Sequence, residues 1–254
     1  MTFNLAFSSS GVRFAAHVGV LAYIQDNNIK IKNYSGTSGG AIVASWGANN
    51  LPARELMNLT VQFGYPAFIM KPSFGLGGMM DHSYFGELIA SYCRPKKNLF
   101  IVTFNVLKMQ MEIWKGEYYN LSKILSATTC IPGLLKPVVY SNGLHIDGIF
   151  ARFCPDDLWD EGMTISVKLK SKTKTKLRYP IDFIVHYLEK NTIEFLEGFQ
   201  KTKEDKKNTI YIQPEVGIIN QIDLFAVSPE DHLELFQKGY ESAQAAFNQQ
   251  TAFT

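Results

Sequence analysis

The sequence predicts an α/β protein in which helices cover a mostly parallel sheet. Two successive units of strand, loop and helix support this class, the first over residues 3–26 and the second over residues 29–49. In each unit an alternating apolar run is followed by a turn of small residues and then by apolar residues at helical spacing. Repeated units of this kind bring parallel strands side by side, with the helices packed on the faces of the sheet.

Size and composition fit one globular domain, which we expect to span residues 1–254. The chain is 46% hydrophobic and 19% charged, and its formal net charge of +2 favours no particular class of partner. No apolar run approaches the roughly 20 residues of a membrane span, and the first residues lack the features of a signal peptide. We therefore expect a cytoplasmic protein that can also contact a membrane peripherally.

The residues that commonly bind metals are scattered. The three cysteines, Cys93, Cys130 and Cys154, stand far apart, which argues against a disulfide framework and against a cysteine-based zinc site. The histidines form no metal-binding spacing either. We expect no metal and no organic cofactor.

The first unit begins with an alternating run at residues 3–7, which predicts a buried strand. A loop of small polar residues follows at 8–13, and apolar residues from Phe14 to Ile24 then recur at helical spacing. His17 stands among apolar residues of this helix, so we expect it to be packed there and not to bind a ligand.

The second unit contains the most informative turn. A strand is expected over residues 29–34, and the sequence Gly-Thr-Ser-Gly-Gly at 36–40 then fits the G-x-S-x-G nucleophile elbow. Gly36 and Gly40 let the strand and the following helix approach closely, and Ser38 lies between them at a helix N-terminus. The unsatisfied N–H groups there favour developing negative charge, so Ser38 is the candidate nucleophile.

The later elements follow from local signals. Pro52 opens a third helix, and Asp81 can cap a fourth that ends near Tyr92. Residues 64–80 combine glycines with phenylalanine and methionine, which predicts a flexible apolar loop. We expect strands at 99–106, 109–114, 163–169 and 209–213, helices at 120–129 and 181–199, a hairpin at 137–146, a charged loop at 201–207 and a last helix from Ser228.

Three segments in this order resemble the patatin-like phospholipase family, in its bacterial-type domain. The loop at 8–13 is similar to that family's glycine-rich oxyanion loop, and residues 36–40 match its nucleophile elbow. The small-residue stretch at 126–133, followed by Asp147 and Gly148, is similar to its third block. The resemblance covers more than half of the chain.

The resemblance implies a three-layer α/β/α sandwich with a Ser-Asp dyad. By this similarity Ser38 is the nucleophile and Asp147 is the base that takes its proton. An exposed aspartate, with a pKa near 4, is a poor base at neutral pH. We therefore expect Asp147 to be partly desolvated, which would raise its pKa toward the working range.

The same resemblance implies that backbone N–H groups of Ser9, Ser10 and Gly11 hold the substrate oxyanion, with Arg13 anchoring the loop. The sequence departs from the family here, because Ser9 and Ser10 stand where glycines are usual and Phe14 follows the basic residue. The N–H donors survive such a change, but the cheap positive φ of glycine does not. Either the loop has ordinary φ angles, or activity is weakened.

His145 offers an alternative to the dyad. Residues i and i+2 of a strand share a face, so His145 and Asp147 could point the same way and form a Ser-His-Asp triad. Against this, a histidine beside its aspartate on one strand must still reach Ser38 with its far nitrogen. We favour the dyad.

A run of cations with period two follows the strand expected at 163–169. In an extended arm such residues share one face, where they are either simply solvated or attract anionic lipid headgroups. The run consists of Lys168, Lys170, Lys172, Lys174, Lys176 and Arg178. No aromatic residues interleave the lysines, so nucleic acid is not the expected partner.

Together these features predict a serine esterase that removes an ester-linked acyl chain from a phospholipid or another acyl lipid. The alternatives are an acyltransferase that uses the same dyad and a lipid-binding pseudoenzyme with a weakened oxyanion loop. We expect residues 64–80 to border the acyl site as a mobile loop. The sequence identifies no activating protein partner.

Overall fold

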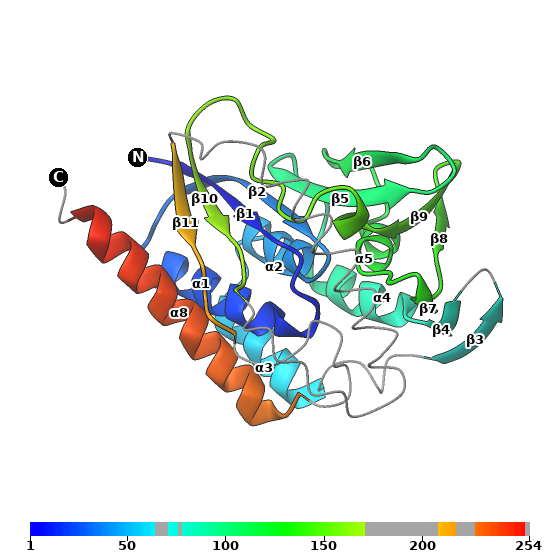
Figure 1. Ribbon diagram of the computed structural model, residues 1–254, viewed down its shortest axis with the longest axis horizontal. Coiled ribbons are helices and arrows are strands. Elements are labelled where there is room, and N and C mark those ends of the chain that lie inside the picture. Colours follow the sequence, from blue (N-terminus) through cyan, green and yellow to red (C-terminus); the bar gives the residue numbers. More distant parts are fainter. Residues whose placement is uncertain (64–70, 76–77, 171–207, 217–226, 252–254) are drawn as a thin grey trace.

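A central sheet organises the computed structural model, which describes residues 1–63, 71–75, 78–170, 208–216 and 227–251. Its described strands follow the order β11-β10-β1-β2-β5-β9-β8, and β6 pairs with β5 outside this path (Figure 1). The strands are β1 (Phe3–Phe7), β2 (Ile31–Thr37), β5 (Leu99–Asn105), β6 (Gln110–Trp114), β8 (Val138–Tyr140), β9 (Gly143–Asp147), β10 (Met163–Val167) and β11 (Thr209–Ile212).

Strands β11, β10, β1, β2 and β5 are parallel, whereas β6, β8 and β9 join by antiparallel pairing. The sheet is thus mostly parallel and flanked by helices, which confirms the predicted α/β class. Parallel strands end at one edge of their sheet, and ligands of open α/β sheets bind outside this edge. Here the edge holds the end of β1 at Phe7 and the end of β2 at Thr37.

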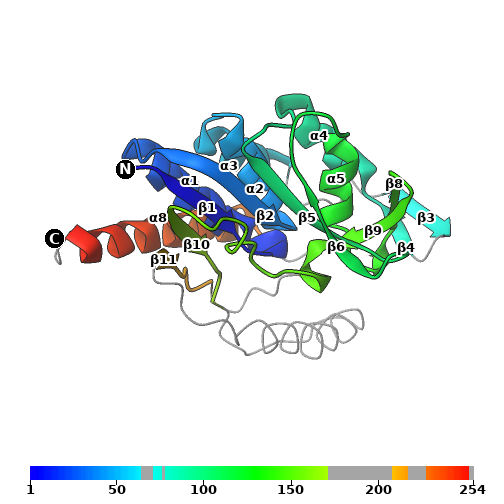
Figure 2. The same cartoon turned by 90° about the horizontal axis from the view of Figure 1, so that it is seen from above.

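Helices flank the central sheet (Figure 2). They are α1 (Phe14–Asp26), α2 (Gly39–Ala48), α3 (Ala53–Phe63), α4 (Ser83–Tyr92), α5 (Leu121–Thr128) and α8 (Pro229–Thr251), with short 3₁₀ turns at Gly11–Arg13 and Gly148–Phe150. Helix α1 is buried from Phe14 to Ile24 because α8 packs along its outer side. A Cβ atom on Gly19 would collide with the carbonyl oxygen of Phe236, so the two helix backbones touch there.

Local signals predicted most of these elements. Helix α1 begins and ends at the expected residues, and α8 begins with the expected cap, in which Ser228 Oγ accepts from the Asp231 N–H at 3.1 Å. The hairpin of β8 and β9 turns at Ser141 and Asn142, which both have positive φ. The helix expected at 181–199 and the charged loop at 201–207 lie outside the described residues.

Part of the segment expected as a loop, residues 64–80, is a strand pair. Strands β3 (Lys71–Gly75) and β4 (Gly78–Asp81) are antiparallel, and β4 pairs in parallel with β7 (Gly133–Leu135) to form a small second sheet. The partner of β4 lies about fifty residues further along the chain, since Met80 pairs with Leu135. Turn residues alone therefore gave no sign of this pairing.

Candidate active site

Ser38 stands in a strained turn between β2 and α2. Its φ of 55° and ψ of −129° lie in a region that residues with a side chain rarely adopt. The surroundings impose this conformation: a Cβ atom on Gly36 would lie 2.5 Å from the Ala41 nitrogen, and one on Gly40 would collide with the carbonyl oxygen of Ser8. The two glycines therefore allow the close packing that the elbow motif predicts, and Ser38 lies at the carboxyl edge of the sheet.

Ser38 and Asp147 meet across this edge. Ser38 Oγ donates to Asp147 Oδ2 at 2.6 Å, although the two residues are 109 positions apart in the sequence. Asp147 is the last residue of β9, and its other oxygen, Oδ1, accepts from the Ile149 N–H at 2.9 Å. Only 5% of Ser38 and 3% of Asp147 is exposed, so this pair lies almost out of contact with water.

Burial changes the acidity of Asp147. Desolvation raises the pKa of this carboxyl to about 7, against the lowering effect of the hydrogen bonds from Ser38 and from the Ile149 N–H. Near neutral pH the group is thus divided between its proton-accepting and proton-donating forms. A carboxylate with this pKa, in hydrogen-bond contact with a serine hydroxyl, can act as a general base.

Thr128 is a contact of the elbow that sequence analysis missed. Its Oγ1 accepts from the Ser38 N–H at 2.9 Å and donates to the carbonyl oxygen of Val102 at 2.6 Å. The threonine ends α5 and thereby connects this helix to β5 and to Ser38. The only signal in the sequence was its place in the small-residue stretch before Asp147.

The loop of Ser8–Arg13 packs directly on the elbow, and several hydrogen bonds hold it there. The Ser9 N–H donates to the carbonyl oxygen of Phe153 at 2.8 Å, and the Arg13 N–H donates to that of Ser10 at 3.1 Å. Arg13 is 1% exposed, and its Nε also donates to the Ser10 carbonyl oxygen, at 3.4 Å. The side chain of Arg13 therefore lies where it can anchor this loop.

His17 supports the other end of the loop. Its Nε2 donates to the carbonyl oxygen of Ser8 at 3.0 Å. Burial lowers the pKa of His17 to about 3, so the ring is neutral and packed, as the sequence suggested. His17 thus helps to hold the loop in place through the Ser8 carbonyl oxygen.

The φ angles of the loop show whether Ser9 and Ser10 adopt a strained backbone conformation. Gly11 has a φ of +53°, whereas Ser10 has a φ of −143° and Ser9 is absent from the residues with positive φ. The left-handed conformation thus falls on the glycine that the loop retains, and the two serines need no strained φ. Of the three expected N–H donors, Ser9 is engaged with Phe153, while those of Ser10 and Gly11 have no acceptor among the described residues.

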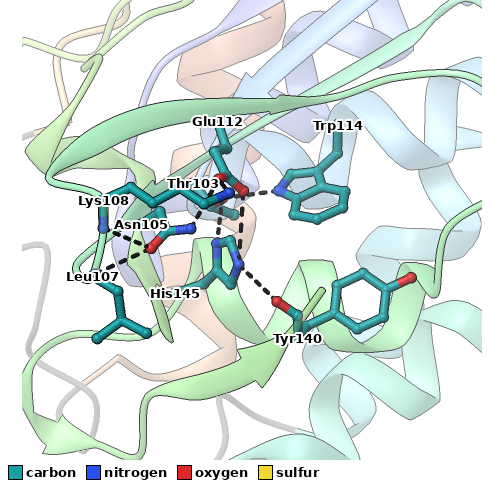
Figure 3. A network of polar contacts seen from close by, with 8 residues as sticks. All are labelled: Thr103, Asn105, Leu107, Lys108, Glu112, Trp114, Tyr140 and His145. Carbon is teal, nitrogen blue, oxygen red and sulfur yellow. Dashed lines mark hydrogen bonds and ion pairs between the residues drawn. The ribbon is translucent and has the colours of Figure 1, made fainter. Parts of the chain in front are cut away.

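His145 belongs to a different polar network (Figure 3). Its Nδ1 lies 3.2 Å from Thr103 Oγ1, and its Nε2 donates to the carbonyl oxygen of Tyr140 at 3.1 Å. Trp114 Nε1 also donates to Thr103 Oγ1, at 2.9 Å. Both ring nitrogens of His145 are therefore used away from Ser38, an arrangement that favours the dyad over the triad.

Glu112 closes this network. Its Oε2 lies 3.7 Å from His145 Nε2, and its Oε1 accepts from Asn105 Nδ2 at 2.8 Å and from Lys108 Nζ at 2.9 Å. Burial acts to raise the pKa of Glu112, but the hydrogen bonds from Lys108 and Asn105 outweigh it and lower the pKa. The network joins residues of β5, β6, β8 and β9 (Figure 3).

An apolar cluster adjoins Asp147. Its buried members come from the loop after β1, from the segment around β7 and from β9: Val12, Cys130, Leu134, Leu135 and Ile146. Ile146 immediately precedes Asp147, and burial followed by the charge of Asp147 raises the pKa of Cys130. Met80 of β4 packs against the same cluster, so the end of the segment at 64–80 borders it.

The basic run is divided by the fold. Lys168 Nζ pairs with Asp156 Oδ2 at 2.8 Å and lies 5.3 Å from the centre of the Tyr211 ring, so its charge is already neutralised. Lys170 is exposed, and its backbone pairs with that of Glu215 in an isolated parallel β-bridge. The other four cations, Lys172, Lys174, Lys176 and Arg178, lie outside the described residues.

Within the described ranges, no group of three or more metal-binding side chains occurs. In the same part of the chain, no helix is both long and apolar enough to cross a membrane.

The fold and the site define a class of protein: an α/β fold whose strand–serine–helix turn meets a buried carboxylate. The family model for patatin-like phospholipase matches residues 5–157. This is more than half of the chain, and the protein belongs to the patatin-like phospholipase family. Membership supports a lipid hydrolase acting on acyl lipids at the level of the family. No curated protein matches the sequence.

VipD and ExoU are among the solved structures that are similar to the chain. VipD from Legionella pneumophila superposes with a TM-score of 0.61 at 11% identity, covering 98% of this chain and 66% of VipD. The type III effector protein ExoU superposes with a TM-score of 0.48 at 12% identity, covering 97% of this chain and 52% of ExoU. The chain thus spans about two thirds of the length of VipD, and the likeness to VipD shows the shared three-layer fold.

Proposed function

We propose that this protein hydrolyses the ester bond of an acyl lipid, as a phospholipase A or lysophospholipase, through an acyl-enzyme intermediate on Ser38. The observation that carries the proposal is the 2.6 Å hydrogen bond from Ser38 Oγ to Asp147 Oδ2, combined with the burial that raises the pKa of Asp147 to about 7. The dyad needs no metal and no organic cofactor. We also propose that residues 1–254 form a single catalytic domain.

The first half of the reaction follows from this contact. Ser38 Oγ bonds to the acyl carbonyl carbon while its proton passes to Asp147, and the carbonyl oxygen becomes an oxyanion. The N–H groups of Ser10 and Gly11, which have no acceptor among the described residues, are the candidates to stabilise that oxygen, together with the N-terminus of α2. When the oxyanion collapses, the bond to the leaving alcohol breaks and the alcohol oxygen takes the proton from Asp147.

Water completes the cycle. Asp147 removes a proton from a water molecule as the water oxygen bonds to the acyl carbon. When the second oxyanion collapses, the bond from the acyl carbon to Ser38 Oγ breaks, Asp147 returns the proton to Oγ, and the fatty acid is released. An acyltransferase would differ only in using an acceptor alcohol in place of water at this step. The same residues would serve both reactions, so the products distinguish them.

The apolar cluster beside the dyad supports an acyl substrate. Val12 and Ile146 stand next to the oxyanion loop and the base, and both are buried among other apolar side chains. An acyl chain bound along this cluster would place its carbonyl carbon near Ser38. Methionine side chains such as Met80 adapt to chains of different shape.

A fluorophosphonate probe tests the proposal, since it labels an activated serine. We expect labelling of wild-type protein, none of Ser38→Ala, and full labelling of Ser45→Ala, whose serine is also buried but bonds to the carbonyl oxygen of Ala41. Incubation with a lipid panel, followed by mass spectrometry, should then detect free fatty acid. An acyl product on another alcohol would instead indicate the acyltransferase, and a folded protein without labelling would indicate a lipid-binding pseudoenzyme.

We further propose peripheral contact with anionic membranes through the basic run. Each basic residue near such a surface contributes about 1 kcal/mol, and the attraction is screened beyond about 10 Å at 0.1 M salt. Replacing Lys170, Lys172, Lys174 and Lys176 with Gln should weaken sedimentation with anionic vesicles but leave hydrolysis of a soluble ester. Lys168→Gln is the matched control, because Lys168 is paired with Asp156. Unchanged vesicle binding would assign the run to plain solvation.

A further inference from the structure

Ser10 carries a buried hydroxyl that nothing in the described part of the chain binds. The residue is 0% exposed, and its Oγ has no hydrogen-bond partner there. Nearly all buried polar side-chain atoms in proteins have a partner, because an unpaired one loses its bonds to water without replacement. A buried hydroxyl without a partner beside a nucleophile therefore suggests that a ligand supplies the missing bond.

The position of this hydroxyl identifies the ligand atom. A Cβ atom on Gly39 would collide with Ser10 Oγ, so the hydroxyl lies directly against the residue that follows Ser38. Gly39 begins helix α2, whose first N–H groups lack partners within the helix. The oxyanion of an acyl substrate forms beside Ser38, where it would meet this hydroxyl and the start of α2.

The loop holds Ser10 in place. The N–H of Ser9 is bonded to Phe153, and the carbonyl oxygen of Ser10 accepts from both the N–H and Nε of Arg13. Ser8 shows the contrast within the same loop: it is equally buried, but its Oγ donates to the carbonyl oxygen of Ser9 at 3.1 Å. Ser8 thus stabilises the loop, whereas the hydroxyl of Ser10 contributes no bond to it.

We propose that the side-chain hydroxyl of Ser10 donates a hydrogen bond to the carbonyl oxygen of the acyl substrate as that oxygen becomes negative. The inference rests on the proposed function and adds a side-chain donor to the expected N–H groups of the loop. A hydroxyl offers one proton and can rotate to aim it, so it can serve without any movement of the backbone. Ser10 is on this basis a catalytic residue and not only part of the loop.

Ser10→Ala tests the inference with two readouts that point in opposite directions. On a soluble short-chain ester, kcat should fall by about 10², in the range found for the loss of one oxyanion donor, while KM stays within about threefold. Fluorophosphonate labelling of Ser38 should slow by a similar factor. The melting temperature should stay equal or rise, because the variant removes an unpaired buried hydroxyl.

Ser8→Ala is the matched control for stability, and it should lower the melting temperature because its hydroxyl is bonded. Ser45→Ala is the control for turnover. A Ser10→Ala variant with kcat within threefold of wild type, or with a lowered melting temperature and unchanged labelling, would overturn the inference. If wild-type protein is neither labelled nor active, the proposed function fails first and the inference fails with it.

Discussion

Asp147 and His145 stand two residues apart on β9, and both are buried polar groups with opposite properties. Asp147 makes two hydrogen bonds through its carboxylate, to Ser38 Oγ and to the Ile149 N–H, and burial raises its pKa to about 7. His145 is 0% exposed, and both of its ring nitrogens lie within hydrogen-bond distance of partners in a network that spans four strands (Figure 3).

The difference shows that neighbouring positions of one strand can hold a carboxyl with a raised pKa and a fully hydrogen-bonded histidine. Asp147 has too few hydrogen bonds to offset its desolvation, so its charged form is costly and readily accepts a proton. The ring of His145 is satisfied on both sides, and a fully satisfied buried network adds rigidity to the structure. Perturbed acidity in a buried pair is typical of functional sites, whereas satisfied networks are typical of cores.

The largest effect should come from removing the nucleophile. Ser38→Ala should lower turnover by several powers of ten, up to about 10⁶, because the dyad acts as a unit. The variant should remain folded, since the Ser38 side chain makes one hydrogen bond, to Asp147. Ester hydrolysis and a circular dichroism melt measure both properties. Activity within tenfold of wild type would remove Ser38 from the mechanism.

Asp147→Asn should lower turnover by roughly 10³–10⁴, as found when a carboxylate is removed from a coupled serine site. The amide still bonds to Ser38 but cannot take its proton. In wild-type protein, kcat/KM should rise with pH and level off above about 7, because only the ionised form of Asp147 is a base. A flat profile between pH 5 and 8 would show that another group accepts the proton.

His145→Ala should affect stability and not turnover, in contrast to Asp147→Asn. We expect the free energy of unfolding to fall by about 1–3 kcal/mol because Thr103 and Tyr140 lose a buried partner, while kcat of the folded protein stays within about threefold. His232→Ala is a matched control because it also removes a buried histidine. Both ring nitrogens of His232 lack hydrogen-bond partners among the described residues, so the comparison isolates the hydrogen bonds of His145. A large loss of kcat with unchanged stability in His145→Ala would revive the triad.

The last expected effect is a dependence of the free energy of unfolding on pH. Because the pKa of Asp147 is about 7 in the folded protein and near 4 in the unfolded chain, the folded state binds one proton more between these values. Its contribution to stability therefore falls as pH rises, by at most about 1.4 kcal/mol per pH unit, and levels off above 7.

Denaturant unfolding of wild type and Asp147→Asn at several pH values isolates this effect, since the other groups are common to both proteins. The stability of the variant relative to wild type should increase from pH 4 to 7 and then stay constant. A difference that does not change with pH would mean that Asp147 keeps an ordinary pKa in the folded protein.

Several features followed from the sequence because they depend on neighbouring residues. The spacing of apolar residues defines α1, Ser228 and Asp231 cap α8, and the elbow needs small residues at 36 and 40. Each of these signals lies within a few positions of the structure that it specifies. The order of three such segments was enough to indicate the family that the family model then matched.

Other features depend on residues that only the folded chain brings together. Burial in the folded chain raises the pKa of Asp147. A contact across 90 positions places Thr128 Oγ1 on the Ser38 N–H. The same holds for the pairing of β4 with β7 and for the ion pair that removes Lys168 from the basic run.

Ser9 and Ser10 depend on both the local sequence and the tertiary structure. The sequence showed serines where glycines are usual in the family. The tertiary structure decided that Gly11 alone takes the positive φ in this loop and that the Ser10 hydroxyl has no hydrogen-bond partner among the described residues. The physical reason is that hydrogen bonding and desolvation depend on every atom around a group, whereas a pattern in the sequence records only its neighbours along the chain.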